Sequence, residues 1–228
     1  MNYIVATIKS WNIDNFDRLK RADQNNSWFL IDKKDDLLPA RVRKIKPRYI
    51  FFPHWSWIIP KEIWQGHECV VFHETDLPYG RGGSPIQNLI VRGHRDTKVS
   101  ALRVAEELDA GDIYMKRDLS LAGTAEEILR RSSDIIFSMI KDIAMKEPSP
   151  VEQTGEVTVF KRRRPEDGNL APLKTTAEAY DYIRMLQAEG YPRAFVETDE
   201  LRFEFEDAEV ADDGVIAKVK IRNKFTKL

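Results

Sequence analysis

The fold is decided by residues 68–87, whose sequence reads ECVVFHETDLPYGRGGSPIQ. Residues 68–72 form a short, valine-containing apolar run, which is typical of a fully buried strand. The glycines and prolines that follow predict an irregular loop, and Ser84 before Pro85 predicts the N-cap and first turn of a helix. This order of strand, loop and helix indicates an open α/β sheet, in which ligands bind beyond the carboxyl ends of the strands. His73 stands at that position in the predicted sheet.

Strands and helices alternate on the amino-terminal side of this stretch. Apolar runs at residues 3–8, 27–31 and 48–52 predict three more buried strands. Between the last two, residues 35–45 place apolar side chains near the 3.6-residue period of a helix. This alternation predicts parallel strand pairing with right-handed crossovers, and therefore an α/β fold with a mostly parallel sheet.

A long helix and a proline-rich break follow on the carboxyl-terminal side. Thr124 and Glu127 form a capping box that opens the helix, and Pro148 and Pro150 end it. The composition becomes more polar beyond that point, which is typical of a domain boundary. We therefore expect a catalytic domain at residues 1–147 and a small domain at residues 148–228.

The predicted small domain mixes a helix with antiparallel strands. A second capping box, Thr175 with Glu178, opens a helix that we expect to run to Glu189. Residues 201–206 alternate strictly between apolar and polar, and residues 215–221 do so in part, which predicts antiparallel strands with one wet face. An α+β unit or a partial barrel follows from this pattern.

The composition limits the partners and the compartment. The 228 residues are 42% hydrophobic, which is enough for one sizeable core and a small appended unit. The 36 Lys and Arg balance 37 Asp and Glu, so we expect no nucleic acid partner, although a local basic patch could still serve. The single cysteine, Cys69, lies in a predicted buried strand, where we expect a packing role. No signal peptide and no apolar window near the ~18 residues of a membrane span is present, so we expect a cytoplasmic protein without a membrane partner.

Three ordered motifs resemble one enzyme family. The signature loop, residues 73–87, has His73 followed by Leu-Pro, Arg-Gly-Gly and Pro-Ile-Gln, as in the 10-formyltetrahydrofolate-dependent formyltransferases. Residues 108–113 resemble the family's Asp-x-Gly-Asp-Ile loop, and three stretches near the carboxyl end resemble its sugar-modifying members. These stretches are residues 161–168, 180–184 and 190–195. The resemblance covers most of the chain from about residue 49 onward, and it implies a Rossmann-like formyltransferase domain that uses 10-formyltetrahydrofolate as its cosubstrate.

The resemblance assigns the chemistry to His73 and Asp109. Formyl transfer needs a donor about 2.7 to 3.1 Å from the developing oxyanion, and a base for the attacking amine. His73 suits the first role, and Asp109 suits the second, because its carboxylate can accept amine protons directly or through water. The charge of Asp109 also favours the charged form of the imidazole. The alternative for His73 is a structural bond to a loop carbonyl. We expect no metal, because four scattered histidines and one cysteine show no metal-ligand spacing.

One position departs from the family pattern. The family has Asn-x-His, and Val71 stands here in place of the asparagine. The amide is ordinarily a second oxyanion donor, and loss of such a donor costs roughly 2.7 to 4 kcal/mol of transition-state stabilisation. His54, Thr75 or a backbone N–H are the candidates to replace it, with His54 first because it also follows a predicted strand. An inactive protein is the alternative.

Two groups of residues are expected to line the site. By resemblance, the apolar loop at residues 53–60 forms a wall of the pterin pocket; the alternative is a loop that only covers the core. Lys9 and Trp11 follow the first predicted strand, where a phosphate and a ring are expected; the alternative is a surface lysine and a partly buried tryptophan. The expected folate group is Trp57, Ile58, Pro60, Leu77, Asp109 and Asp112, and the expected acceptor group is Lys9, Trp11, Tyr79, Arg81, Gly82 and Gly83.

The resemblance favours an amino sugar as acceptor. The short chain and the His-Glu-Thr-Asp-Leu-Pro variant are most similar to formyltransferases of pseudaminic acid biosynthesis, which implies UDP-4-amino-4,6-dideoxy-2-acetamido-altrose as a small-molecule nucleotide-sugar substrate. The alternatives are methionyl-tRNA formyltransferase-type activity on another amine, and a catalytically inactive protein that binds folate or a nucleotide sugar. A homodimer is expected by analogy alone.

Overall fold

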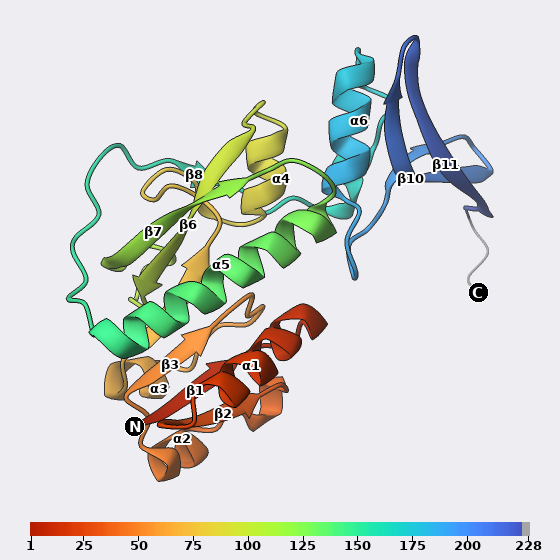
Figure 1. Ribbon diagram of the computed structural model, residues 1–228. Helices are drawn as coiled ribbons and strands as arrows, with labels where there is room; N and C mark the ends of the chain where they lie inside the picture. The colour runs from red at the N-terminus through yellow and green to blue at the C-terminus, as the bar shows by residue number, and fades with distance from the viewer. Residues whose placement is uncertain (225–228) are drawn as a thin grey trace. The chain divides into compact units, whose positions relative to one another are not determined.

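The computed structural model describes residues 1–224, which form two compact units (Figure 1). The first unit contains residues 1–82, 97–119 and 130–159, and the second contains residues 83–96, 120–129 and those from Phe160 onward. The chain therefore passes between the units several times. No single cut of the chain separates these two units. The domain boundary expected between residues 147 and 148 stays a prediction.

A six-stranded sheet is the centre of the fold, with strand order β2-β1-β3-β4-β6-β7. The pairs β1–β2, β1–β3 and β3–β4 are parallel, and β4–β6 is antiparallel, so the predicted mostly parallel sheet is confirmed. The apolar runs that form β1, β3 and β4 are buried along nearly their whole length, whereas the run that forms the edge strand β2 leaves Ser27 and Phe29 exposed. The strands are β1 (Asn2–Ala6), β2 (Ser27–Ile31), β3 (Tyr49–Phe52), β4 (Cys69–His73), β6 (Asp96–Arg103) and β7 (Ile113–Ser120).

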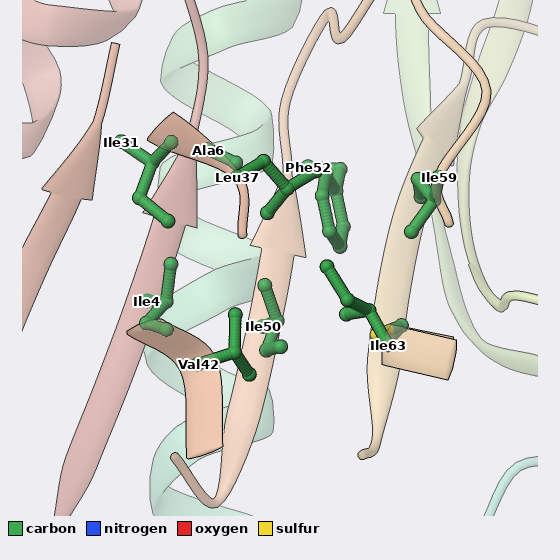
Figure 2. Close-up of a cluster of buried hydrophobic side chains, with 10 residues drawn as sticks. Ile4, Ala6, Ile31, Leu37, Val42, Ile50, Phe52, Ile59 and Ile63 are labelled. Atoms are coloured by element: carbon green, nitrogen blue, oxygen red, sulfur yellow. The ribbon is translucent and has the colours of Figure 1, made fainter. Parts of the chain in front are cut away.

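Helices cover both faces of this sheet. On one face, α2 (Pro39–Ile45) and α3 (Lys61–Gly66) contribute Val42 and Ile63 to a cluster with strand residues, as Figure 2 shows. On the other face lie α1 (Ser10–Ala22) and α5 (Ala125–Lys146). The Asn15 amide donates to the Ser133 hydroxyl (2.8 Å), which ties α1 to α5. The cluster in Figure 2 is Ile4, Ala6, Ile31, Leu37, Val42, Ile50, Phe52, Ile59, Ile63 and Cys69.

Two predicted helix starts differ from the structure. The helix expected from residue 35 is interrupted: a 3-10 turn, η1 (Lys34–Asp36), precedes α2, which begins at Pro39 because proline is favoured at the first helical position. Pro85 likewise opens α4 (Pro85–Ile90) as predicted, but the N-cap role of Ser84 is wrong. Ser84 adopts a left-handed conformation (φ 53°), and its hydroxyl accepts the N–H of Arg163 (3.1 Å) instead of capping the helix.

The second unit carries the predicted antiparallel strands. Its three-stranded sheet has the order β11-β10-β9, with β10 antiparallel to both neighbours. The Thr175–Glu178 capping box is present and opens the helix. The helix ends at Met185, earlier than predicted, where the N–H groups of Leu186 and Gln187 bond three residues back, to Ile183 and Arg184. Further elements are β5 (Arg81–Gly82), β8 (Val159–Phe160), η2 (Pro165–Gly168), α6 (Thr176–Met185), β9 (Ala194–Glu197), β10 (Leu201–Ala211) and β11 (Gly214–Asn223). None of the helices within residues 1–224 is both long and apolar enough to cross a bilayer.

Candidate active site

The structure brings His73 and Asp109 together. His73 is the last residue of β4 and is 7% exposed, and its Nδ1 lies 3.7 Å from Asp109 Oδ2. Its Nε2 lies 2.8 Å from the carbonyl oxygen of Gly80, so Nε2 must carry a proton, because a carbonyl only accepts. Asp109 Oδ2 also accepts the N–H of Gly82 (2.9 Å). The predicted pair is thus brought together, and the catalytic roles of His73 and Asp109 stay predictions.

A tight turn at residues 109–111, here called the catalytic turn, presents the Asp109 carboxylate. Asp109 has a positive φ of 56°, which is uncommon for a residue with a side chain. A Cβ on Gly111 would lie 1.9 Å from the carbonyl oxygen of Arg103, so only glycine fits there. The turn conformation therefore depends on both residues.

Gly111→Ala is expected to lower the free energy of unfolding by about 1–3 kcal/mol or more, because a methyl group would overlap a backbone oxygen that cannot move independently. Urea denaturation measures the change. Gly66→Ala is the matched control, since nothing lies within 4 Å of its added Cβ, and it should stay within about 0.5 kcal/mol of the wild type. Equal stability of the two variants would contradict the packing seen at the catalytic turn.

His54 is engaged on both ring nitrogens. Its Nε2 lies 2.9 Å from Glu74 Oε1, and its Nδ1 lies 3.1 Å from the Asn12 amide nitrogen and 3.3 Å from Trp11 Nε1. Two N–H donors at Nδ1 require that nitrogen to be an acceptor, so the network assigns a neutral imidazole with the proton on Nε2. Neither nitrogen is left for an oxyanion, and we propose instead that His54 supports Glu74.

Glu74 is a buried carboxylate that the sequence pattern did not single out. It is 6% exposed and accepts hydrogen bonds from His54 and from the Ser132 hydroxyl (3.1 Å). Burial by itself raises the pKa of this carboxyl, but the hydrogen bonds from His54 and Ser132, together with the nearby His73, outweigh it and hold the pKa below its ordinary value. Glu74 is thus ionised, and because His54 is neutral the contact is a charge-assisted hydrogen bond.

The other two candidates for the missing amide are also engaged within the protein. The Thr75 hydroxyl is fully buried and directed at the Gly80 carbonyl (3.4 Å), and the Gly82 N–H donates to Asp109. Val71 itself packs against the apolar cluster of Leu77, Leu102 and Ile113. A second oxyanion donor therefore requires one of these bonds to be exchanged when substrate binds.

The residues expected near folate lie in different environments. Ile58 is 86% exposed, which is unusual for a large apolar side chain and fits a surface that a ligand covers. Trp57 is half-buried with its ring edge-to-face with Trp55 (4.9 Å), and Pro60 is exposed at the start of α3. Leu77 is in the core, and Asp112 lies 3.9 Å from an Arg103 nitrogen. Their roles as folate contacts stay predictions.

The residues expected near the acceptor are also placed. The Lys9 ammonium lies 5.5 Å from the centre of the Trp11 ring, and Trp11 is buried against His54. Tyr79 is half-buried in the signature loop. The Arg81 guanidinium donates to the side-chain oxygen of Gln153 (2.9 and 3.2 Å), a residue just beyond the proline-rich break for which no sequence signal existed. The acceptor roles of Lys9, Trp11, Tyr79, Arg81, Gly82 and Gly83 stay predictions.

Three further observations concern the cysteine, metal binding and a close packing contact. Burial raises the pKa of the Cys69 thiol, which agrees with a packing role for this residue. In the part of the chain that the structure describes, no three His, Cys, Asp or Glu side chains are grouped to hold a metal ion. In the second unit, a Cβ on Gly83 would lie 2.5 Å from the Cβ of Arg162, so glycine lets the two segments pack closely.

Comparison with known proteins identifies the family. Residues 21–134 match the family described as "Formyl transferase", and residues 165–222 match "Methionyl-tRNA formyltransferase, C-terminal domain". A solved methionyl-tRNA formyltransferase from Clostridium thermocellum is 52% identical, with a TM-score of 0.96, and the match covers 98% of this chain and 99% of that one. Methionyl-tRNA formyltransferase from Thermodesulfovibrio yellowstonii is 26% identical over 66% of this chain and 52% of its own length. The chain spans about half the length of the curated relatives it matches.

These relatives correct the expected acceptor. A sugar N-formyltransferase from a Shewanella species shares the fold (TM-score 0.69) but is only 14% identical. The prediction of a nucleotide-sugar acceptor is therefore wrong, and so is the prediction of no nucleic acid partner, because the far more similar proteins are named for methionyl-tRNA. The net charge of −1 misled because it sums the whole chain and does not report a local patch. The chain belongs to the formyl transferase family, whose enzymes transfer a formyl group from 10-formyltetrahydrofolate.

Proposed function

We propose that this protein transfers the formyl group of 10-formyltetrahydrofolate to the amine of the methionyl group carried by tRNA. The observation that carries this proposal is the 52% identity to a methionyl-tRNA formyltransferase over nearly the full length of both chains. The His73–Asp109 pair supports it, because it offers the two groups that the reaction needs. A cytoplasmic location, where charged tRNA is used, belongs to the same proposal.

The reaction divides between the two side chains. The amine nitrogen attacks the formyl carbon, and the former carbonyl oxygen becomes an oxyanion that accepts a hydrogen bond from His73. Asp109 takes a proton from the attacking nitrogen, directly or through water. The bond from the formyl carbon to N10 then breaks, the carbonyl re-forms, and N10 gains a proton as tetrahydrofolate leaves. His73 must release the Gly80 carbonyl for this role, since its Nε2–H is now bound there.

The second unit offers a surface that suits an RNA backbone. Lys161, Arg162 and Arg164 are exposed, and within residues 1–224 none of the three forms an ion pair. Two cations of the three-stranded sheet differ, because Lys218 pairs with Asp207 (2.8 Å) and Arg222 pairs with Glu204 (3.0 Å). Uncompensated lysine and arginine attract phosphates and supply most of the non-specific affinity for nucleic acid.

Formyl transfer to methionyl-tRNA is expected when the protein is incubated with 10-formyltetrahydrofolate. Mass spectrometry of the released amino acid should show N-formylmethionine, and tetrahydrofolate should form in equal amount. Uncharged tRNA is the control and should release no tetrahydrofolate. UDP- and dTDP-linked amino sugars should remain unmodified. No formylmethionine, with folate still bound, would reject the proposed acceptor and leave a binding protein or a different amine.

A further inference from the structure

The chain segment at residues 151–158, here called the strap, contacts both loops of the candidate site. At its first end, Val151 pairs with Ile113 through two backbone hydrogen bonds (2.8 and 2.9 Å), directly after the catalytic turn. At its other end, the carbonyl of Thr158 accepts the N–H groups of Gly80 and Arg81, each at 3.0 Å. Gly80 is the residue whose own carbonyl faces His73. The strap is therefore fixed both to the signature loop and to the chain that follows the catalytic turn.

Gln153 lies in the middle of the strap and joins the two loops through its side chain. Its amide nitrogen donates to the carbonyl oxygens of Asp109 and Gly111, both at 2.8 Å. Its amide oxygen accepts from Arg81 Nε (3.2 Å) and Nη2 (2.9 Å). Both N–H groups and both lone pairs of the amide are thus used. The orientation of the amide is determined by its partners, since carbonyls only accept and a guanidinium only donates.

The catalytic turn needs this support. A non-glycine residue in the left-handed region is strained, and such strain persists only where the surroundings hold it. Gln153 binds the carbonyl of Asp109 and that of Gly111, one at each end of the turn. The Asp109 carboxylate, 3.7 Å from His73, extends from the same residue. Loss of the Gln153 amide would free the turn to relax and would move the carboxylate.

We propose that Gln153 is a positioning residue that sets the distance between the Asp109 carboxylate and His73. It holds the catalytic turn directly and holds the signature loop through Arg81. This inference rests on the proposed formyl transfer by His73 and Asp109. A misplacement of about 1 Å at a reacting group can cost about 100-fold in rate, which is the scale of the expected effect.

Two substitutions separate this role from simple support of Arg81. Gln153→Met keeps the length of the side chain and removes both polar ends. Gln153→Glu keeps an oxygen for Arg81 but places a second oxygen against the carbonyls of Asp109 and Gly111. We expect both variants to lose about 10- to 100-fold in kcat on methionyl-tRNA, with KM for folate and for tRNA within about twofold of the wild type. Gln65→Met, on the exposed side of α3, is the matched control and should keep full activity.

A second measurement does not depend on the acceptor. The Gly82 N–H donates to Asp109 Oδ2, so its hydrogen exchange reports the position of that carboxylate. We expect faster exchange at Gly82 in Gln153→Met than in the wild type or in Gln65→Met. Wild-type activity in Gln153→Glu, or unchanged exchange at Gly82 in Gln153→Met, would overturn the positioning role. A wild-type protein that fails to formylate methionyl-tRNA would instead reject the proposed function, and the exchange rates would still decide the role of Gln153.

Discussion

His73→Ala is expected to lower kcat for formyl transfer by about 10²- to 10⁴-fold, the range over which a positioned donor or acid–base group acts. The substitution removes the imidazole that faces Asp109, and it leaves the Gly80 carbonyl with the Thr75 hydroxyl as its remaining side-chain donor. KM for folate should change little, because the lost interaction belongs to the transition state. Single-turnover kinetics with methionyl-tRNA measure the effect. His67→Ala is the control, because His67 follows α3 at the other end of the sheet's strands, before β4 begins.

A double variant of His73 and Asp109 tests whether the two residues act together. Asp109→Asn alone should also lower kcat, since the amide cannot accept the amine proton. If His73 and Asp109 act as a unit, the double variant should be little worse than the poorer single variant. Asp118→Asn is the matched control and should keep full activity, because Asp118 is exposed on β7 and belongs to neither predicted group of site residues. Losses that multiply in the double variant would indicate two independent roles and contradict the pairing.

Local sequence signals predicted the parts of the fold that depend on neighbouring residues. The apolar run before His73 forms β4, and the two capping boxes begin their helices where Thr124 and Thr175 predict. Each of these features depends on residues within one helical turn or one strand of each other. A local sequence pattern therefore includes all the residues that determine it. Ser84 failed for the opposite reason. Its hydroxyl accepts from the backbone of Arg163, 79 residues away, and that contact overrides its preference for an N-cap.

The sequence predicted only some features of the candidate site. The pairing of His73 with Asp109 came from family resemblance, because no pattern in the sequence brings two residues 36 positions apart together. Glu74 and Gln153 carried no signal, since an isolated glutamate or glutamine in a polar segment is ordinarily solvated. Only the folded chain shows that Glu74 is buried and hydrogen-bonded to His54, and that Gln153 joins two loops. The prediction of a nucleotide-sugar acceptor was wrong because short motifs shared within a family reflect common ancestry more than substrate specificity.

Glu74→Ala is expected to cause the largest loss of stability among the substitutions considered. It leaves the buried donors of His54 and Ser132 without an acceptor, at about 1–3 kcal/mol for each, and it removes a side chain that is 8% exposed. Guanidinium denaturation should show a lower midpoint with an unchanged slope. Glu106→Gln is the control, because that carboxylate is 81% exposed and pairs with Lys61 at the surface. A change in Glu74→Ala no larger than in the control would mean that the buried network contributes nothing.

The pH dependence of Glu74→Gln tests the charge alone, since glutamine keeps the shape of the side chain. The pKa of Glu74 is lowered in the folded protein from its ordinary value of 4.5, so the unfolded chain binds this proton more readily than the folded chain does. The stabilisation is therefore fully present above about pH 4.5 and is lost as the pH falls through the folded value. The difference in unfolding free energy between wild type and Glu74→Gln should shrink over that range. A difference that stays constant between about pH 7 and pH 3 would show that folding leaves the pKa of Glu74 unchanged. Wild-type stability that rises relative to Glu74→Gln as the pH falls from about 7 to about 4.5 would show that Glu74 is neutral when folded.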